Sequence, residues 1–241
     1  MRIQAGDMHF QKLNQAVRAT EDTRVIIDNC LGQRYIASGL GGKEIVINGT
    51  PGNALGAYMD GCTVTVNGNA QDATGDTMNA GEIRIHGSSG DATGYAMRGG
   101  RILVHGDTGY RAGIHMKAYQ DKVPVLVVGG RAGSFLGEYQ AGGLIVVLGL
   151  SGDGREAPVG YFCGTGMHGG RMFLRCEEPP AGLPPQVHAR AATDEDLEEI
   201  LPHLEAFCSE FSEDLEAIRN GRFYLLTPDT KNPYKQLYTQ N

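Results

Sequence analysis

Asp72 and Asp91 are the residues whose type and spacing come nearest to a catalytic pair. They stand 19 residues apart, in a series that begins at Asn53 and ends at Tyr110. If that spacing is one structural repeat, the carboxylates lie about 5 Å apart and repel, which raises the pKa of one of them. A carbohydrate-active enzyme is therefore one alternative. No Lys or Arg in phase completes a lyase site, so a solvent-screened pair of turn residues is the favoured interpretation.

Gly164 to Gly169 match GxGxxG, the pattern of dinucleotide-binding loops. Such a loop follows a strand and opens a helix, whose N-terminus receives the pyrophosphate. The residues after it, Arg171 to Cys176, are instead typical of a strand. Nearby Cys163 and His168 suggest a nucleophile and its base, but Cys163 falls on a position that is apolar elsewhere in the chain. We interpret it as a core residue.

His86 and His105 occupy equivalent positions 19 residues apart, after Asn48 and Asn67. Metal sites need three or four converging ligands, and no acid or cysteine joins these histidines in phase. A polar Asn/His ladder on an outer face is the better interpretation. We therefore predict no catalytic, cofactor-binding or metal-binding residue, and no cofactor.

The spacing of 19 belongs to a Gly-rich repeat. Gly49, Gly68, Gly87 and Gly106 are each 19 residues apart, and longer intervals later in the chain are insertions into the same unit. Each unit combines an alternating apolar segment with glycines and an apolar position that is usually Met. The glycines we assign to the repeat are Gly49, Gly52, Gly56, Gly68, Gly75, Gly87, Gly90, Gly94, Gly106, Gly109, Gly113, Gly130, Gly133, Gly137 and Gly149.

Alternation of apolar and polar residues predicts strands with one buried face, and a fixed period of this length is typical of stacked repeats. We expect an all-β solenoid, a right-handed single-stranded parallel β-helix of about seven 19-residue coils, with a short N-terminal helix and a C-terminal helical extension. The expected division is a helical cap over 1–22, the repeat over 23–178, and a linker with an acidic helical extension over 179–241.

Charge is concentrated in the predicted extension. The whole chain carries a net charge of −7, yet residues 193–217 contain ten acids and no Lys or Arg, which leaves +3 for the rest. Thr193 and Asp196 form a capping box before a helical apolar pattern. Without a basic stripe, nucleic acid is not an expected partner.

The cell compartment is predicted from the cysteines and the apolar segments. Five cysteines without a CxxC pair, after a polar start, predict reduced thiols in a cytoplasmic protein. No apolar run is long enough for a membrane span, so we expect no membrane partner either.

A partner interface is expected where the regular repeat is interrupted or carries charge. One column of equivalent positions contains Asp60, Arg98 and Lys117. The insertions 118–124 and 151–158 leave the repeat outline, and inserted residues often form loops on a binding face. The candidate interface residues are Asp60, Arg98, Lys117, Asp153, Arg155 and Glu156.

The repeat resembles the GXGXG domain of glutamate synthases, and is most similar to the stand-alone, archaeal-type subunit. The segments that carry the resemblance are GQRYIASGL, GTPGNALGAYMDG, GNAQDATGDTMNAG, GDATGYAMRGG, GYRAGIHMKAY, GGRAGSFLGEYQAGG, GTGMHGG and the terminal PYKQLY. The C subunit of formylmethanofuran dehydrogenase is a more distant relative. Cys176 departs from the pattern because it replaces the last repeat glycine.

The resemblance implies a non-catalytic scaffold. In glutamate synthases an amidotransferase part releases ammonia from glutamine, and an FMN and iron–sulfur part uses it to convert 2-oxoglutarate to glutamate. This chain would hold the two parts together, as a subunit of an oxidoreductase of nitrogen metabolism without activity of its own. Scaffolds of N-methylglutamate synthase or formylmethanofuran dehydrogenase (formyltransferase) complexes, and a homo-oligomer, stay open as alternatives.

Overall fold

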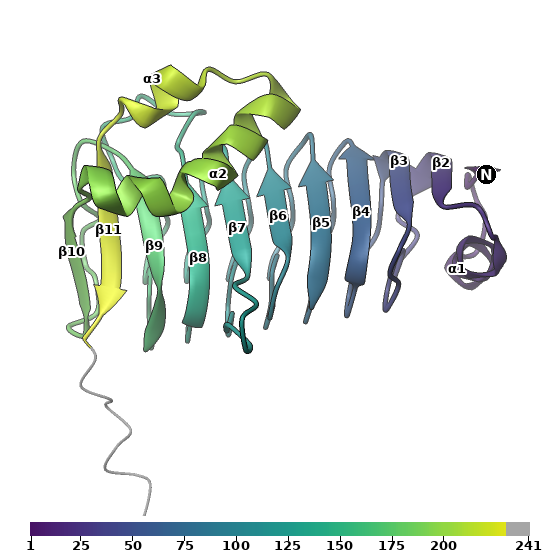
Figure 1. Cartoon of the computed structure of the whole chain (residues 1–241), viewed down its shortest axis with the longest axis horizontal. Helices are drawn as coiled ribbons and strands as arrows, with labels where there is room; N and C mark the ends of the chain where they lie inside the picture. Colours follow the sequence, from purple (N-terminus) through teal and green to yellow (C-terminus); the bar gives the residue numbers. More distant parts are fainter. Residues whose placement is uncertain (230–241) are drawn as a thin grey trace, which may run out of the picture.

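The computed structural model describes residues 1–229. Its first nine strands are parallel and lie side by side in chain order (Figure 1). These strands are β1 (Arg2–Gln4), β2 (Arg24–Leu31), β3 (Glu44–Thr50), β4 (Asp60–Asn67), β5 (Ala80–Ile85), β6 (Arg101–Val104), β7 (Val125–Val128), β8 (Ala141–Val147) and β9 (Gly169–Arg175). β11 (Phe223–Pro228) then pairs antiparallel with β9, and β10 (Val187–Ala191) pairs antiparallel with β11. The terminal PYKQLY segment lies outside the described residues.

The predicted fold class is wrong. Instead of an all-β solenoid in the form of a single-stranded parallel β-helix, residues 1–229 form one open, mixed sheet of 11 strands together with three helices. The connections between strands are turns that make only isolated bridges, such as Ala70 with Ser89, so within residues 1–229 no second sheet forms. After β9 the chain reverses and adds two antiparallel strands, which the repeat did not predict because it stops there.

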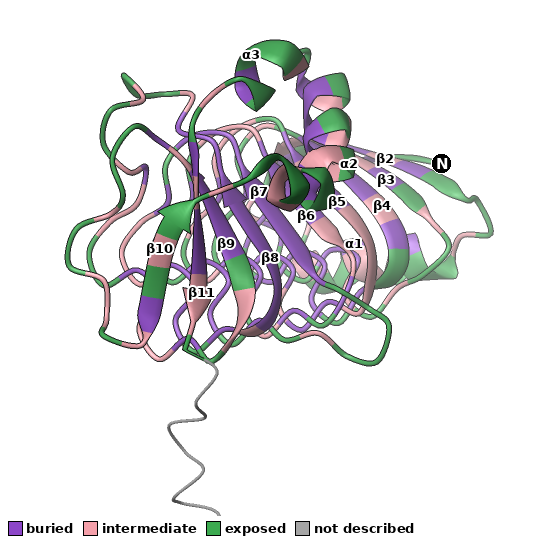
Figure 2. Ribbon diagram, turned by 60° about the vertical axis from the view of Figure 1, so that its left-hand side comes forward, coloured by how far each residue is buried: buried purple, intermediate pink, exposed green. Residues whose placement is uncertain are grey.

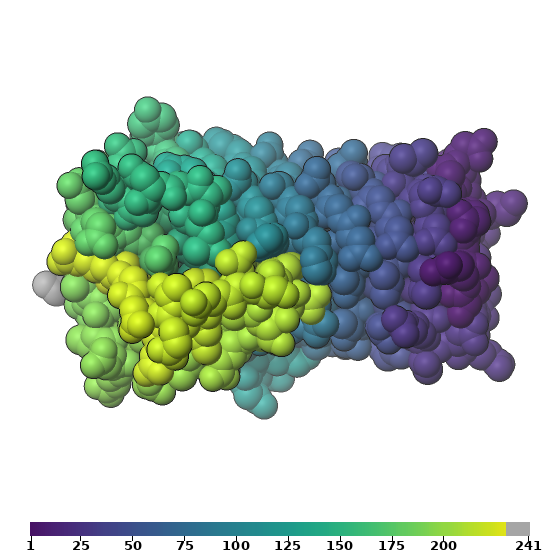
Figure 3. Space-filling view, turned by 90° about the horizontal axis from the view of Figure 1, so that it is seen from above, coloured from purple at the N-terminus to yellow at the C-terminus, as the bar shows by residue number. Residues whose placement is uncertain are grey.

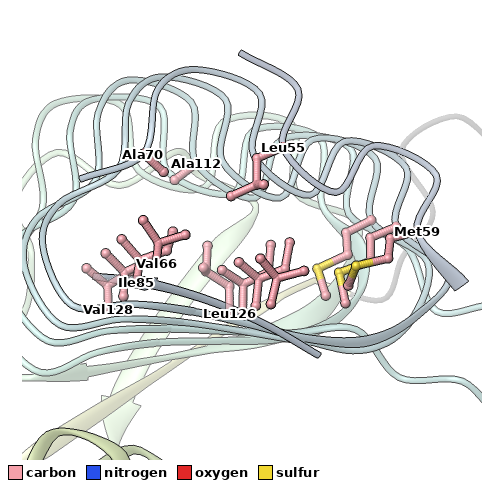
Figure 4. Packing of buried hydrophobic residues seen from close by; sticks show 14 of the residues in the cluster. Leu55, Met59, Val66, Ala70, Ile85, Ala112, Leu126 and Val128 are labelled. Carbon is pink, nitrogen blue, oxygen red and sulfur yellow. The ribbon is translucent and has the colours of Figure 1, made fainter. Parts of the chain in front are cut away.

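The 19-residue spacing nevertheless sets the strand register. Ile45 pairs with Val64, and Val64 pairs with Ile83, so equivalent residues form columns. The inward residues of each strand are fully buried between the strands and the turns that return beneath them (Figure 4). Met59 and the later methionines form a further buried column beside them. Met side chains suit such an irregular interior because they are flexible.

The returning turns have an unusual backbone. In seven successive repeats, three alternate residues adopt positive φ, for example Ala54, Gly56 and Tyr58, with φ of 62°, 67° and 57°. The N–H groups of Ala54 and Tyr58 donate to the next repeat, at Asp72 and Asp76, while that of Gly56 donates back to Ile36. Left-handed conformations are costly for residues other than Gly. Hydrogen bonds in both directions hold each turn in place.

Two helical regions flank the sheet. α1 (Phe10–Ala19) buries Leu13 and Val17 at the end of the sheet near β1. α2 (Asp194–Phe211) lies across the outer face of the later strands, and α3 (Leu215–Arg219) follows it. Seen from above, the segment that contains α2 and α3 extends over only the half of the molecule with the later strands, and the half with the first strands is free of it (Figure 3).

The sequence of the strands explains where α2 lies. Outward residues of β4 and β5 are polar, as at Thr65 and Arg84. From β6 onward they become apolar and buried, as at Leu103, Val127 and Val146 (Figure 2). These residues form a second core with the apolar face of α2, separate from the core inside the repeats. The domain boundaries proposed at 22/23 and 178/179 stay predictions.

Candidate functional site: an exposed aromatic surface

The side chains of the paired aspartates accept hydrogen bonds from the main chain of the next repeat. The Asp72 carboxylate accepts the N–H of Asp91 at 2.9 Å, and the Asp91 carboxylate accepts the N–H of Tyr110 at 2.8 Å. Both residues are exposed, and within residues 1–229 neither forms an ion pair. A column formed by Asn69, Ser88 and Asp107 bonds successive repeats in the same way. This arrangement explains an aspartate at these positions without a carbohydrate-active site.

The histidine column is where the end of α2 meets the sheet. His86 Nε2 lies 3.1 Å from Glu210, and His105 Nε2 lies 2.8 Å from Glu213. The His105 ring stacks on Phe211 with centroids 4.9 Å apart. The expected polar ladder therefore holds for Asn48 and Asn67, which bond at 2.7 Å, but the histidines bind a helix. Across residues 1–229 no group of His, Cys, Asp or Glu could hold a metal ion.

Cys163 and the GxGxxG match belong to the framework. Cys163 is buried against Met172, and this burial raises the pKa of its thiol to about 12. The match leads into β9 and not into a helix, so it lacks the N-terminus that would bind a pyrophosphate. Gly164 and Gly166 have φ of 71° and 69°, as the turn column requires.

The charged column predicted as an interface contacts the first insertion. Asp60 forms an ion pair of 3.7 Å with Lys122, which lies in that insertion. Arg98 and Lys117 are exposed, and within the described part of the chain neither forms an ion pair. In the second insertion Asp153 accepts the N–H of Arg155 at 3.0 Å. Glu156 is exposed and lines a groove described below.

A cluster of aromatic side chains, exposed except for the half-buried Phe135, gathers on the turns of the later repeats. Tyr110, Phe135 and Phe162 follow one another, with ring centroids 5.2 Å and 4.8 Å apart. Tyr161 extends the series and is 80% exposed, while Phe162 is 58% exposed. Arg111 lies over the rings of Tyr110 and Phe135. We call these five residues the aromatic cluster.

The framework holds the aromatic cluster rigidly. Arg111, Phe135 and Phe162 occupy the same left-handed turn position in successive repeats. Arg111 is also fixed by an ion pair of 2.7 Å with Glu138, whose side chain is only 7% exposed. Rigid Tyr, Phe and Arg side chains lose little entropy on binding, and Tyr and Arg are enriched at the centre of protein interfaces.

A groove of about 650 Å³ adjoins the aromatic cluster. It lies between Tyr161 and Phe162 on one side and the prolines Pro179 and Pro180 on the other. Glu156 and Glu178 give it acidic edges. The cluster and groove present apolar area with charged neighbours and no reactive group, which suits recognition of another protein more than catalysis.

Sequence reasoning missed the aromatic cluster, although a signal was present. The column of Asp72 and Asp91 continues beyond Tyr110, across both insertions. Its next members are Ser134 and, after the second insertion, Tyr161. Following the column across both insertions would have found Phe135 and Phe162 in the neighbouring column, each two residues before a turn glycine.

Comparison with known proteins gives the family. The profile described as the GXGXG motif matches residues 7–219, so the chain belongs to the GXGXG motif family. This confirms the resemblance at the level of the domain, whereas the subunit setting remains a proposal. The chain is also 46% identical to the uncharacterized protein MJ1350 of Methanocaldococcus jannaschii, over 98% of this chain and 95% of that protein. None of the helices within residues 1–229 is both long and apolar enough to cross a membrane.

Proposed function

We propose that this chain is a non-catalytic scaffold subunit of a glutamate synthase-like complex. It would hold a glutamine amidotransferase subunit and an FMN and iron–sulfur synthase subunit in one assembly. The observation that carries the proposal is the aromatic cluster, an exposed and rigid surface on a GXGXG-family chain. The candidate residues for chemistry bind the main chain, a helix or the core instead, which supports a structural role.

Copurification is the first test. We expect the tagged full-length chain to capture an amidotransferase-like chain and an FMN-domain chain from its own cells, and to show neither glutaminase activity nor bound flavin alone. Capture of neither chain contradicts the proposal. Capture of a methyltransferring or formyl-transferring assembly instead would move the scaffold to an N-methylglutamate synthase or formylmethanofuran dehydrogenase complex.

Variants of the aromatic cluster test the surface itself. Replacing Phe162 with Ala should weaken binding of one partner about tenfold or more, because central aromatic residues often contribute 2 kcal/mol or more. Tyr58→Ala is the matched control. Tyr58 is also 58% exposed on a left-handed turn position, but it lies three repeats before the first residue of the cluster. Equal affinities of the two variants would show that the cluster is not the docking surface.

A further inference from the structure

A second cavity, of about 360 Å³, lies at the opposite edge of the second insertion. Its walls are the turn after β8, the end of β9 and the segment that leads into β11. The side chains with charge on these walls are Arg175, Arg222, Asp153 and Glu177. The volume is within the range of small-molecule sites.

Arg175 has hydrogen-bond donors without acceptors. The one hydrogen bond that its guanidinium forms within residues 1–229 is a long one, 3.4 Å from Nη1 to the Leu148 carbonyl. Its Nε atom is buried and has no partner, and Gly221 packs directly against it where a larger residue would overlap the guanidinium. Arg171, four residues earlier in the same strand, instead forms an ion pair of 2.6 Å with Glu199. Because Gly221 shields Nε, a ligand in the cavity would meet the two Nη groups, and Nη2 forms no hydrogen bond within residues 1–229.

Arg222 supplies a second cation at the same cavity. Its guanidinium lies 5.3 Å from the centre of the Tyr224 ring, and no ion pair of Arg222 occurs in the described part of the chain. The turn 149–154 adds main-chain donors. Asp153 and Gly154 both line the cavity, their N–H groups reach no protein acceptor within residues 1–229, and Gly154 has φ of 73°. Successive free N–H groups in such turns form anion-binding concavities.

We propose that this cavity binds a small oxyanion, a phosphate or carboxylate group, between Arg175 and Arg222. Guanidinium groups recognise both kinds of oxyanion by paired hydrogen bonds. Of the two acids, Asp153 is engaged by the N–H of Arg155 at 3.0 Å. Glu177 stays exposed beside the site and opposes an anion, so it limits the affinity.

Calorimetric titration of the full chain with inorganic phosphate and with succinate tests the proposal and identifies the anion. Saturable binding of either probe is expected. Tighter binding of phosphate assigns the site to phosphorylated compounds, and tighter binding of succinate assigns it to dicarboxylates. Arg222→Gln should weaken binding at least tenfold, and Arg175→Gln should do the same in a protein whose circular dichroism is unchanged. Arg155→Gln, on the same insertion but outside the cavity walls, is the control and should bind as the parent does.

Glu177→Gln separates an anion site from a cation site. Removing its charge should tighten phosphate or succinate binding several-fold, because it removes a repulsion. The absence of saturable binding by both probes, binding that Arg222→Gln leaves unchanged, or binding that Glu177→Gln weakens would each overturn the proposal.

Discussion

At the scale of single residues, the turn backbone determines which side chains each position accepts. Gly75 has φ of 72°, and a Cβ at this position would overlap the Cδ1 methyl of Ile102 inside the core. Gly75→Ala should therefore lose about 3 kcal/mol of unfolding free energy, from the left-handed conformation and from overpacking together. Urea unfolding measures the change.

Gly42→Ala is the matched control for this prediction. Gly42 has nearly the same φ, 69°, but an added Cβ meets nothing within 4 Å. It should lose only the conformational part, about 1 to 2 kcal/mol. Equal losses in the two variants would mean that contact with Ile102 does not define the Gly75 position.

The cysteines provide a second prediction at this scale. All five are buried, and burial raises the pKa of Cys163 to about 12 and those of Cys30 and Cys176 to about 11. Because the thiolate is the reactive form, we expect these thiols to react with a thiol reagent at pH 8 only after unfolding. A native protein that reacts rapidly at pH 8 would contradict this, and full reaction in guanidinium is the control.

The column positions of most inward residues could be predicted from the sequence, because glycine and apolar spacing report them directly. The other left-handed positions could not. Ala54, Ala73 and Ala92 share one such position, but Ala carries no sequence signature of positive φ. The aromatic cluster is visible in the sequence only when its two columns are continued across both insertions, because most earlier repeats have Asn, Asp or Ala at these positions.

At the scale of elements, α2 depends on its first turn. Thr193 and Asp196 form the predicted capping box, and Arg190 binds both carboxylate oxygens of Asp196, at 2.6 Å and 2.8 Å. These bonds, those from Arg190 foremost, hold the pKa of Asp196 well below its usual 3.8. The helix thus begins on a charged pair that links it to β10.

Asp196→Asn should destabilise the protein by about 1 kcal/mol or more at pH 7, since the ion pair with Arg190 is lost and the charged half of the capping box is weakened. The folded pKa of Asp196 is lowered, so its contribution is complete above about pH 4 and is lost as the pH falls toward the folded pKa. The variant should therefore lose less stability than the parent between pH 5 and pH 3. Asp194→Asn, in the same turn but outside the capping box, is the control in denaturant titrations at both pH values. A variant with the parent's pH dependence would contradict the assignment.

The existence of α2 could be predicted, but its binding face could not. The capping box and apolar spacing are local signals, so they are readable in one segment. The surface that α2 covers is formed by the outward residues of four separate strands, β6 to β9. These residues are apolar, as at Leu103 and Val127, whereas the equivalent residues of β4 and β5 are Thr65 and Arg84. That change becomes meaningful only once the strands are known to be neighbours.

At the scale of the whole molecule, the helix α2 and the aromatic cluster occupy different surfaces. α2 covers the later strands on one side, and the aromatic cluster lies on the turns of the same repeats. The acids of residues 193–217 are therefore partly used to bind the sheet, as in Arg84 with Glu210 at 2.9 Å. A partner can reach the aromatic cluster without displacing the helix, which agrees with a scaffold that is folded before assembly.

The register of the sheet gives the last prediction. Gly68 to His86 is one 19-residue unit, and its neighbours on both sides repeat its column positions. Deleting these 19 residues places Val64 opposite Ile102, which preserves the inward and outward faces. The shortened chain should still fold and unfold cooperatively on heating, because each unit contacts mainly its neighbours. Its Tm should be lower, because the bonds of Glu210 to Arg84 and His86 are lost.

Deleting only residues 68–77 removes the returning turn and leaves β4 joined directly to β5, so this smaller deletion should be far more damaging. Circular dichroism compares the two, and a ten-residue deletion as stable as the 19-residue one would show that the repeat does not govern folding.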